Sequence, residues 1–412
     1  MRVRGGEYSG NSLLSVRPSR QIDLKQPRHE STDRLPGLDL LRAIAILWVM
    51  DFHAQAFQIV ASSDHVARFG WMGVDLFFAL SGFLIGSQLL RPLSKGQALR
   101  PVPFYFRRLF RTLPPYLAVV TLYFMVPVFR ESPRIAPLWQ FLTFTENLFV
   151  DSHHARAFSH AWSLCIEEQF YLVAPVAAYL LARRPAGWKV VMLCISIVLG
   201  GTLLRAAIWL HALAPVAGVM HGYGNFFQRW VELIHYPTWT RLDGLLAGVV
   251  VAMFKSFRPG VWHIFMRRGN LLLGGALPCL AVAICLFRDQ SAFLPSVIGY
   301  PILSLGMGCL VAAGASPSSL ISRRALPGVG AVAAMAYSLY LTHKGVYHLV
   351  GLVAGQSLAG HYTLAIMVYG GAALLGGALL YASVERPALL LRDRFLPREA
   401  TALPPSAARQ LA

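Results

Sequence analysis

An arginine and a histidine lie eleven residues apart in the first long apolar segment of the chain, near residues 38–60. In a helix, Arg42 and His53 share nearly one face and lie roughly 16 Å apart along the axis, at about 1.5 Å per residue. Ionisable groups in a bilayer core cost about 2.5–3.5 kcal/mol each on insertion scales. A membrane segment that keeps such groups uses them mostly to line a polar cavity or to carry out chemistry.

The chemistry that suits His53 is general-base catalysis. A carboxylate beside a histidine orients the imidazole and stabilises the imidazolium that forms after proton capture. Four carboxylates can take this part, and the sequence does not tell which of them contacts His53: Asp51, Asp75, Glu167 and Glu168. The alternative is a purely structural histidine whose ring is hydrogen-bonded to a hydroxyl group of a neighbouring helix.

A cluster of arginines opens another apolar segment. Arg107, Arg108 and Arg111 precede Pro114 in this stretch, and Arg107 and Arg111 share a helix face. Guanidinium groups bind phosphates through paired hydrogen bonds, so these residues are candidates for holding a phosphorylated substrate. The alternative is that they anchor the segment at the membrane surface. The same alternative holds for Arg42, whose long side chain can reach the interface from the end of its segment.

Two more segments carry ionisable groups. Arg241 and Asp243 begin one of them, and His343 lies within the other. Together with the segments of His53, of Asp75 and of the two glutamates, five apolar segments contribute ionisable side chains at overlapping depths. Such groups must face protein or water, which predicts a polar cavity between helices.

The elements that position these residues are membrane spans. The 412 residues are 56% hydrophobic and 14% charged, whereas soluble domains contain about 25% charged residues. Runs of about 17–25 apolar residues are long enough to cross a bilayer as helices. We therefore predict an all-α, polytopic membrane protein with about ten transmembrane helices, near residues 38–60, 71–90, 112–130, 162–182, 188–210, 238–255, 270–287, 297–315, 329–354 and 363–384.

The distribution of positive charge predicts the orientation of these spans. Lysine and arginine concentrate in both terminal segments and in alternate connections, which the positive-inside rule assigns to the cytoplasm. Both termini are thus expected inside, with Arg42 near the cytoplasmic end of its span and His53 in the outer half. The predicted parts are a disordered basic cytoplasmic tail (1–37), a transmembrane domain (38–388) and a second cytoplasmic tail (389–412). The net charge of +18 then reflects topology, and no nucleic-acid partner is expected.

Metal and redox sites are not expected. The five cysteines fall inside apolar segments without the short paired spacing of a zinc or redox motif. The predicted outer loops are rich in histidine, but none of these histidines has a persuasive second ligand beside it in the sequence. We expect no bound metal and no bound cofactor.

Several motifs occur in a fixed order over residues 35–388: Arg42-x10-His53; Gly73-Val74-Asp75-Leu76-Phe77-Phe78 with Ser81-Gly82-Phe83; Phe104 to Tyr116 with the three arginines; Trp162-Ser163-Leu164 with Glu167-Glu168-Gln169-Phe170-Tyr171; Arg241-x-Asp243; and Tyr337 to His343. Each motif alone is weak, but the ordered set resembles the acyltransferase-3 family of integral membrane O-acyltransferases.

The resemblance implies transfer of an acyl group, commonly acetyl from acetyl-CoA, to a hydroxyl group of a carbohydrate or lipid-linked glycan, and a place in a bacterial inner membrane. His53 would be the general base or a transient acyl carrier, with Asp75, Glu167 and Glu168 balancing charge. Arg107, Arg108 and Arg111 would hold the CoA phosphates, Arg42 would orient the CoA end, and Arg241, Asp243 and His343 would complete the polar cavity.

Two alternatives stay open at the level of sequence. Some members of the family acylate macrolide-type natural products instead of glycans. Buried histidine, arginine and acidic groups also build the proton relays of secondary transporters and flippases. Against transport, the sequence shows no internal repeat and no pair of interrupted spans in two halves.

Overall fold

The computed structural model describes residues 35–61, 63–151, 156–183, 187–217 and 223–396. Contacts divide the chain into Met1–Arg34 and Leu35–Ala412, and all of the described helices belong to the second unit. Most of the predicted N-terminal tail therefore lies outside the described residues. Within the described ranges the fold is all-helical, with one isolated β-bridge between Ile135 and Ala157 as the sole β pairing.

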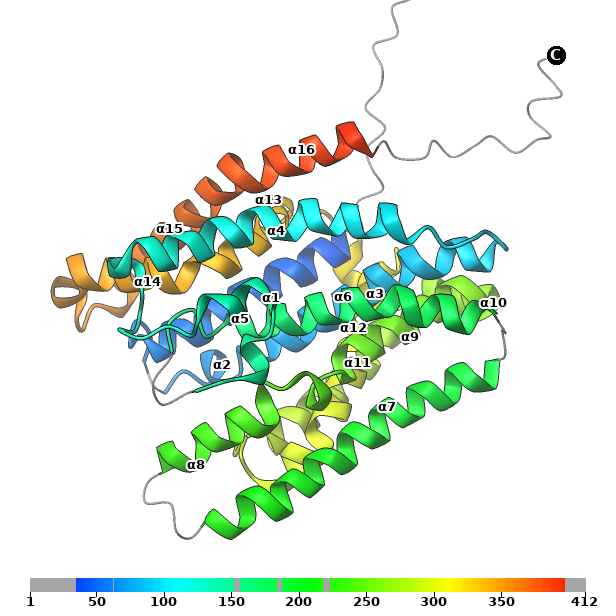
Figure 1. The fold of residues 1–412 in the computed structure, drawn as a ribbon, viewed down its shortest axis with the longest axis horizontal. Helices are drawn as coiled ribbons and strands as arrows, with labels where there is room; N and C mark the ends of the chain where they lie inside the picture. The colour runs from blue at the N-terminus through cyan, green and yellow to red at the C-terminus, as the bar shows by residue number, and fades with distance from the viewer. Residues whose placement is uncertain (1–34, 62, 152–155, 184–186, 218–222, 397–412) are drawn as a thin grey trace, which may run out of the picture. The chain divides into compact units, whose positions relative to one another are not determined.

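One long helix overlaps each of the ten predicted spans (Figure 1). These helices are α1 (Pro36–Ala56), α3 (Met72–Ser94), α4 (Pro101–Met125), α6 (Ala161–Arg183), α7 (Gly187–Ile208), α9 (Asp243–Phe257), α11 (Gly269–Leu286), α12 (Tyr300–Ala315), α14 (Ala336–Leu358) and α15 (Tyr362–Leu380). Shorter helices connect or flank them: α2 (His65–Arg68), α5 (Leu138–Leu142), α8 (Tyr223–Trp230), α10 (Pro259–Arg267), α13 (Val329–Ala334) and α16 (Arg386–Phe395).

Several boundaries differ from the prediction, and the span predicted over 329–354 is divided between α13 and α14. Helix α4 begins at Pro101, a favourable first helical residue, and continues through Pro114 and Pro115. The three arginines therefore lie inside the helix, before the prolines. Helix α16 occupies the first part of the predicted C-terminal tail.

Six helical stretches are long and apolar enough to cross a membrane, or seven if α9 and α10, which meet at a bend of 110°, form one span. Helices α1, α4 and α14 have 21, 25 and 23 residues but are not among the six. Helices α1 and α4 each carry three charged side chains, and α14 carries His343 and Lys344. Three of the long helices that carry candidate site residues are thus less apolar than the six membrane-crossing stretches.

Helix α1 lies between two groups of helices and contacts members of both (Figure 1). Helices α4, α14, α15 and α16 pack together on one side, and α3, α9, α11 and α12 pack together on the other. Glycines bring α3 and α9 into close contact, because a Cβ atom at Gly82 would lie 2.0 Å from the carbonyl oxygen of Leu245. Gly82 therefore permits close approach of these two helices.

Candidate functional site

The imidazole of His53 is paired with a second imidazole. His53 Nδ1 lies 2.9 Å from His343 Nε2, across the contact between α1 and α14. His343 is fully buried and its Nδ1 lies 3.0 Å from the carbonyl oxygen of Leu339. Among the described residues, the side chain that pairs with the His53 ring is therefore an imidazole and not one of the four expected carboxylates.

This geometry fixes where the protons lie on both neutral rings. The carbonyl oxygen of Leu339 only accepts, so His343 Nδ1 donates to it and His343 Nε2 carries a lone pair. His53 Nδ1 must then donate to His343 Nε2, which leaves the lone pair of His53 on Nε2. His343 can thus orient the His53 ring as a carboxylate would, but without supplying a negative charge.

A third histidine stands beside this pair and was not predicted as a site residue. The ring centre of His160 lies 6.1 Å from that of His53 and 5.1 Å from that of His343. His160 is buried, and among the described residues no side chain forms a hydrogen bond with either of its ring nitrogens, although the ring interacts with the backbone of Leu341. Within that structure, no three His, Cys, Asp or Glu side chains are arranged to hold a metal ion.

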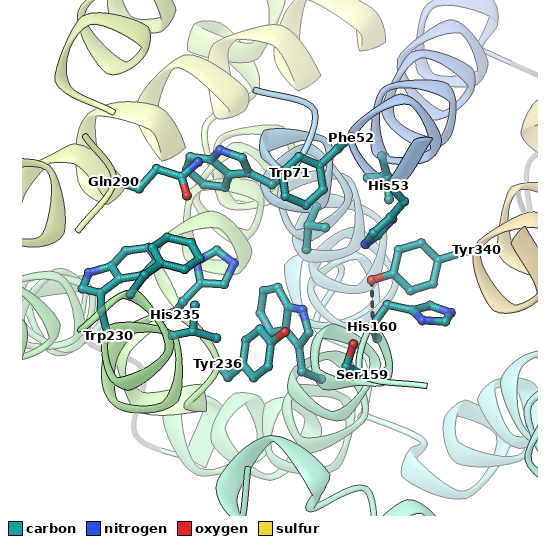
Figure 2. A pocket seen from close by; sticks show the side chains of 15 residues that line it. Phe52, His53, Trp71, Ser159, His160, Trp230, His235, Tyr236, Gln290 and Tyr340 are labelled. Carbon is teal, nitrogen blue, oxygen red and sulfur yellow. Dashed lines mark hydrogen bonds between the residues drawn. The ribbon is translucent and has the colours of Figure 1, made fainter. Parts of the chain in front are cut away.

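The His53 ring forms part of the wall of a cavity of about 120 Å³ (Figure 2). Figure 2 shows Tyr340 and His160 near His53 on one side and a group of aromatic rings around the rest. The Trp162 ring stacks on Tyr236 at 5.0 Å, and the Trp230 ring stacks on His235 at 5.3 Å. The aromatic side chains of the lining are Phe52, Trp71, Trp162, Phe227, Trp230, Tyr236 and Tyr340.

Asp75 does not contact His53 but supports the cavity wall from behind. Its two carboxylate oxygens lie 2.9 and 3.0 Å from Arg241 Nη2, and both side chains are buried. Arg241 Nη1 donates to Nδ1 of His235 at 3.0 Å, and its guanidinium lies 5.3 Å from the centre of the Trp162 ring. The expected pair of cavity groups, Asp75 and Arg241, is thus an ion pair that fixes two lining residues.

Asp243, the other predicted polar residue of this region, has a different partner. Its Oδ2 lies 2.6 Å from Nη1 of Arg205, a fully buried residue of α7. The same nitrogen donates to the carbonyl oxygen of Thr240 at 2.7 Å. Asp243 therefore joins α7 to α9 and is not among the residues that line the cavity.

The two adjacent glutamates of α6 belong to a second polar cluster. Glu167 accepts hydrogen bonds from Ser81 at 2.9 Å and from Tyr171 at 3.0 Å. The positive charge of Arg108 acts on both Glu167 and Glu168. These carboxylates therefore balance the arginine of α4 and are not partners of the histidines.

Arginines from two helices meet at this second cluster. The charges of Arg108 and Arg111 act on the guanidinium of Arg42, which also pairs with Asp39 at 3.3 Å. Arg108 donates to Gln88 at 3.1 Å, and its Nε has no partner in the described structure. Among the same residues no contact joins Arg107 to the others, so Arg42, Arg108 and Arg111 form the cationic cluster.

Helix α1 therefore connects two sites. Arg42 places the cationic cluster near its first residues, and His53 places the histidine cluster near its last ones. The two residues lie roughly 16 Å apart along the helix, at about 1.5 Å per residue. Helices α3 and α14, which carry Asp75 and His343, contact α1 directly.

The comparison with known proteins gives one family. Residues 35–382 match a family model described as acyltransferase domain. The chain is 27% identical over 383 residues to O-acetyltransferase OatA of Staphylococcus aureus, which covers 86% of this chain and 57% of that protein. It is 28% identical over 247 residues to peptidoglycan O-acetyltransferase OatA of Listeria monocytogenes, covering 57% and 36%. The chain thus spans about half the length of the curated relatives it matches, or less. No solved structure matches it.

Proposed function

Since the chain belongs to the acyltransferase domain family, we propose that it is a membrane O-acetyltransferase. It moves an acetyl group from acetyl-CoA to a hydroxyl group of a carbohydrate acceptor, in the inner membrane of a bacterium. The observation that supports this best is the His53–His343 pair in the wall of an aromatic cavity. The names of the two relatives support the acetyl group, and that of the Listeria relative makes peptidoglycan the first acceptor to test.

The proposed reaction uses His53 as the general base. Nε2 of His53 takes the proton of the acceptor hydroxyl while the hydroxyl oxygen attacks the thioester carbonyl carbon. The carbon–sulfur bond then breaks, the acetyl group stays on the acceptor oxygen, and the CoA thiolate takes the proton from the imidazolium. The aromatic walls suit the apolar faces of sugar rings, while His235, Gln290 and Ser159 offer hydrogen-bonding groups in the same lining.

The donor is proposed to bind at the other end of α1. Arg42, Arg108 and Arg111 provide the positive charge that the phosphates of CoA require. Its pantetheine arm would span the distance along α1 to the histidines. In the topology predicted from the positive-inside rule, the donor comes from the cytoplasm and the acceptor from the outer side.

The test is the release of free CoA by the purified protein in lipid nanodiscs. We expect acetyl-CoA turnover that a peptidoglycan fragment accelerates, with one acetylated glycan formed for each free CoA. A proton flux coupled to glycan movement in proteoliposomes, without release of CoA, would contradict the proposal and favour a transporter.

Replacement of His343 tests how His53 is oriented. His343→Leu removes the side chain that accepts from His53 Nδ1–H and helps to orient the ring, and we expect kcat to fall at least about tenfold. His343→Gln retains an acceptor oxygen and should retain more activity than the leucine variant. Equal activity of the two variants, measured by CoA release at matched protein amounts, would contradict the orienting role.

A further inference from the structure

The short segment that carries Ser159 and His160 has a strained backbone. Phe158 has a φ of 59°, in the left-handed region that a residue with a bulky side chain rarely adopts. Its fully buried ring stacks on Tyr123 at 4.5 Å and on Phe141 at 5.6 Å. Such a conformation persists only where surrounding contacts hold it in place.

An ion pair provides two of these contacts. Glu131 Oε1 accepts from the backbone N–H of Phe158 at 3.0 Å and lies 2.9 Å from Nζ of Lys344. The Lys344 ammonium also donates to Oγ of Ser159 at 3.0 Å. The exposed fractions of the two side chains are 10% for Lys344 and 6% for Glu131. Lys344 follows His343 on α14, so the pair ties residues 158–159 to the helix that orients His53.

The segment held in this way contributes to the wall of the cavity. Ser159, His160 and His53 all line it (Figure 2), and the backbone oxygen of His160 accepts from the Tyr340 hydroxyl at 2.9 Å. Burial, followed by the charge of Lys344, lowers the pKa of His160 well below its usual value, so this ring is neutral. A neutral imidazole carries one N–H donor and one lone pair that accepts, so the His160 ring brings both kinds of group to the cavity wall.

We propose that Glu131 and Lys344 are positioning residues of the acyl-transfer site. Through Phe158 and Ser159 they set the turn at residues 158–160, and with it the place of His160 beside His53. The proposal rests on the proposed function for its catalytic part. It extends the site to Glu131, which lies between α4 and α5 and belongs to no motif of the chain.

The kinetic test compares single variants with the double variant. Glu131→Leu and Lys344→Met each leave one buried charge unpaired, whereas the double variant leaves none. We expect all three to lower kcat at least about tenfold, with the KM for acetyl-CoA within about twofold of wild type, because the donor site lies at the other end of α1. Lys344→Arg, which keeps the cation and its donors, should recover most of the activity. Recovery of wild-type kcat in the double variant would overturn the proposal, since the pair would then only neutralise charge.

Hydrogen–deuterium exchange tests the positioning role of Glu131 without a measurement of enzymatic activity. The backbone N–H of Phe158 should exchange at least about tenfold faster in Glu131→Leu than in wild type, because it loses its acceptor. The matched control is Arg130→Gln, which removes a neighbouring charge that binds the carbonyl oxygens of Tyr123 and Phe124 instead. It should leave both kcat and this exchange rate unchanged. Unchanged exchange in Glu131→Leu, or equal acceleration in the control, would overturn the positioning role. A wild-type protein that releases no CoA would overturn the proposed function alone. The exchange rates would still show whether Glu131 holds the backbone at Phe158.

Discussion

Replacement of His53 by alanine is expected to lower kcat for acetyl transfer by about 10²–10⁴-fold, the usual contribution of a positioned general base. The physical reason is that the hydrogen bond to His343 orients the lone pair on His53 Nε2, while His343 Nε2 is itself occupied by His53. The measurement is CoA release and glycan acetylation by purified protein in nanodiscs.

The control for this experiment is His348→Ala, which removes another imidazole from α14 that is not among the lining residues. It should retain wild-type kcat, and both variants should show the thermal stability of the wild type. Full activity of His53→Ala at wild-type membrane levels would remove His53 from the mechanism.

Charge reversal in the cationic cluster should have the second large effect. In the double variant Arg108→Glu/Arg111→Glu, two cations that interact electrostatically with Arg42 become anions. The new anions lie near Glu167 and Glu168 of α6, whose charges already interact with Arg108. We expect the KM for acetyl-CoA to rise at least about a hundredfold, because charged phosphate contacts are worth about 1.5–3 kcal/mol each. The affinity for the glycan should stay close to that of the wild type.

The control for the cationic cluster is Arg107→Glu, because no contact among the described residues joins Arg107 to Arg42 or to the glutamates. It should change the KM for acetyl-CoA much less than the double variant does. Poor membrane insertion of all three substitutions, with a normal KM in the protein that does insert, would show that these arginines only anchor α4.

The sequence predicts the helices well and the contacts between them poorly. Apolar runs locate the ten long helices approximately, although only six helical stretches among the described residues are long and apolar enough to cross a membrane. The cost of burying charge identifies Arg42 and His53. The partner of His53 was not predictable, because His343 lies 290 residues away in the chain. A carboxylate was the reasonable expectation, but each of Asp75, Glu167 and Glu168 has partners of its own in the structure.

The ion pair between Glu131 and Lys344 was not predicted from the sequence. Glu131 lies in a polar connection with several charged residues and, by composition alone, resembles a solvated loop. Lys344 is different, since a lysine inside an apolar span requires a partner. The sequence therefore indicates that Lys344 needs a partner, but only the fold shows that this partner is Glu131.

The size of the cavity beside His53 affects how much acetyl donor the proposed reaction would lose to hydrolysis. A volume of about 120 Å³ has room for only a few water molecules. A general base can activate water as well as a sugar hydroxyl, and water that attacks the thioester consumes the donor without acetylating the glycan. A sugar ring that enters between the aromatic walls displaces the competing nucleophile itself. The fraction of acetyl groups lost to hydrolysis is then set by how completely the acceptor fills the cavity. A poorly fitting glycan would therefore be acetylated more slowly and would also increase the hydrolysis of acetyl-CoA.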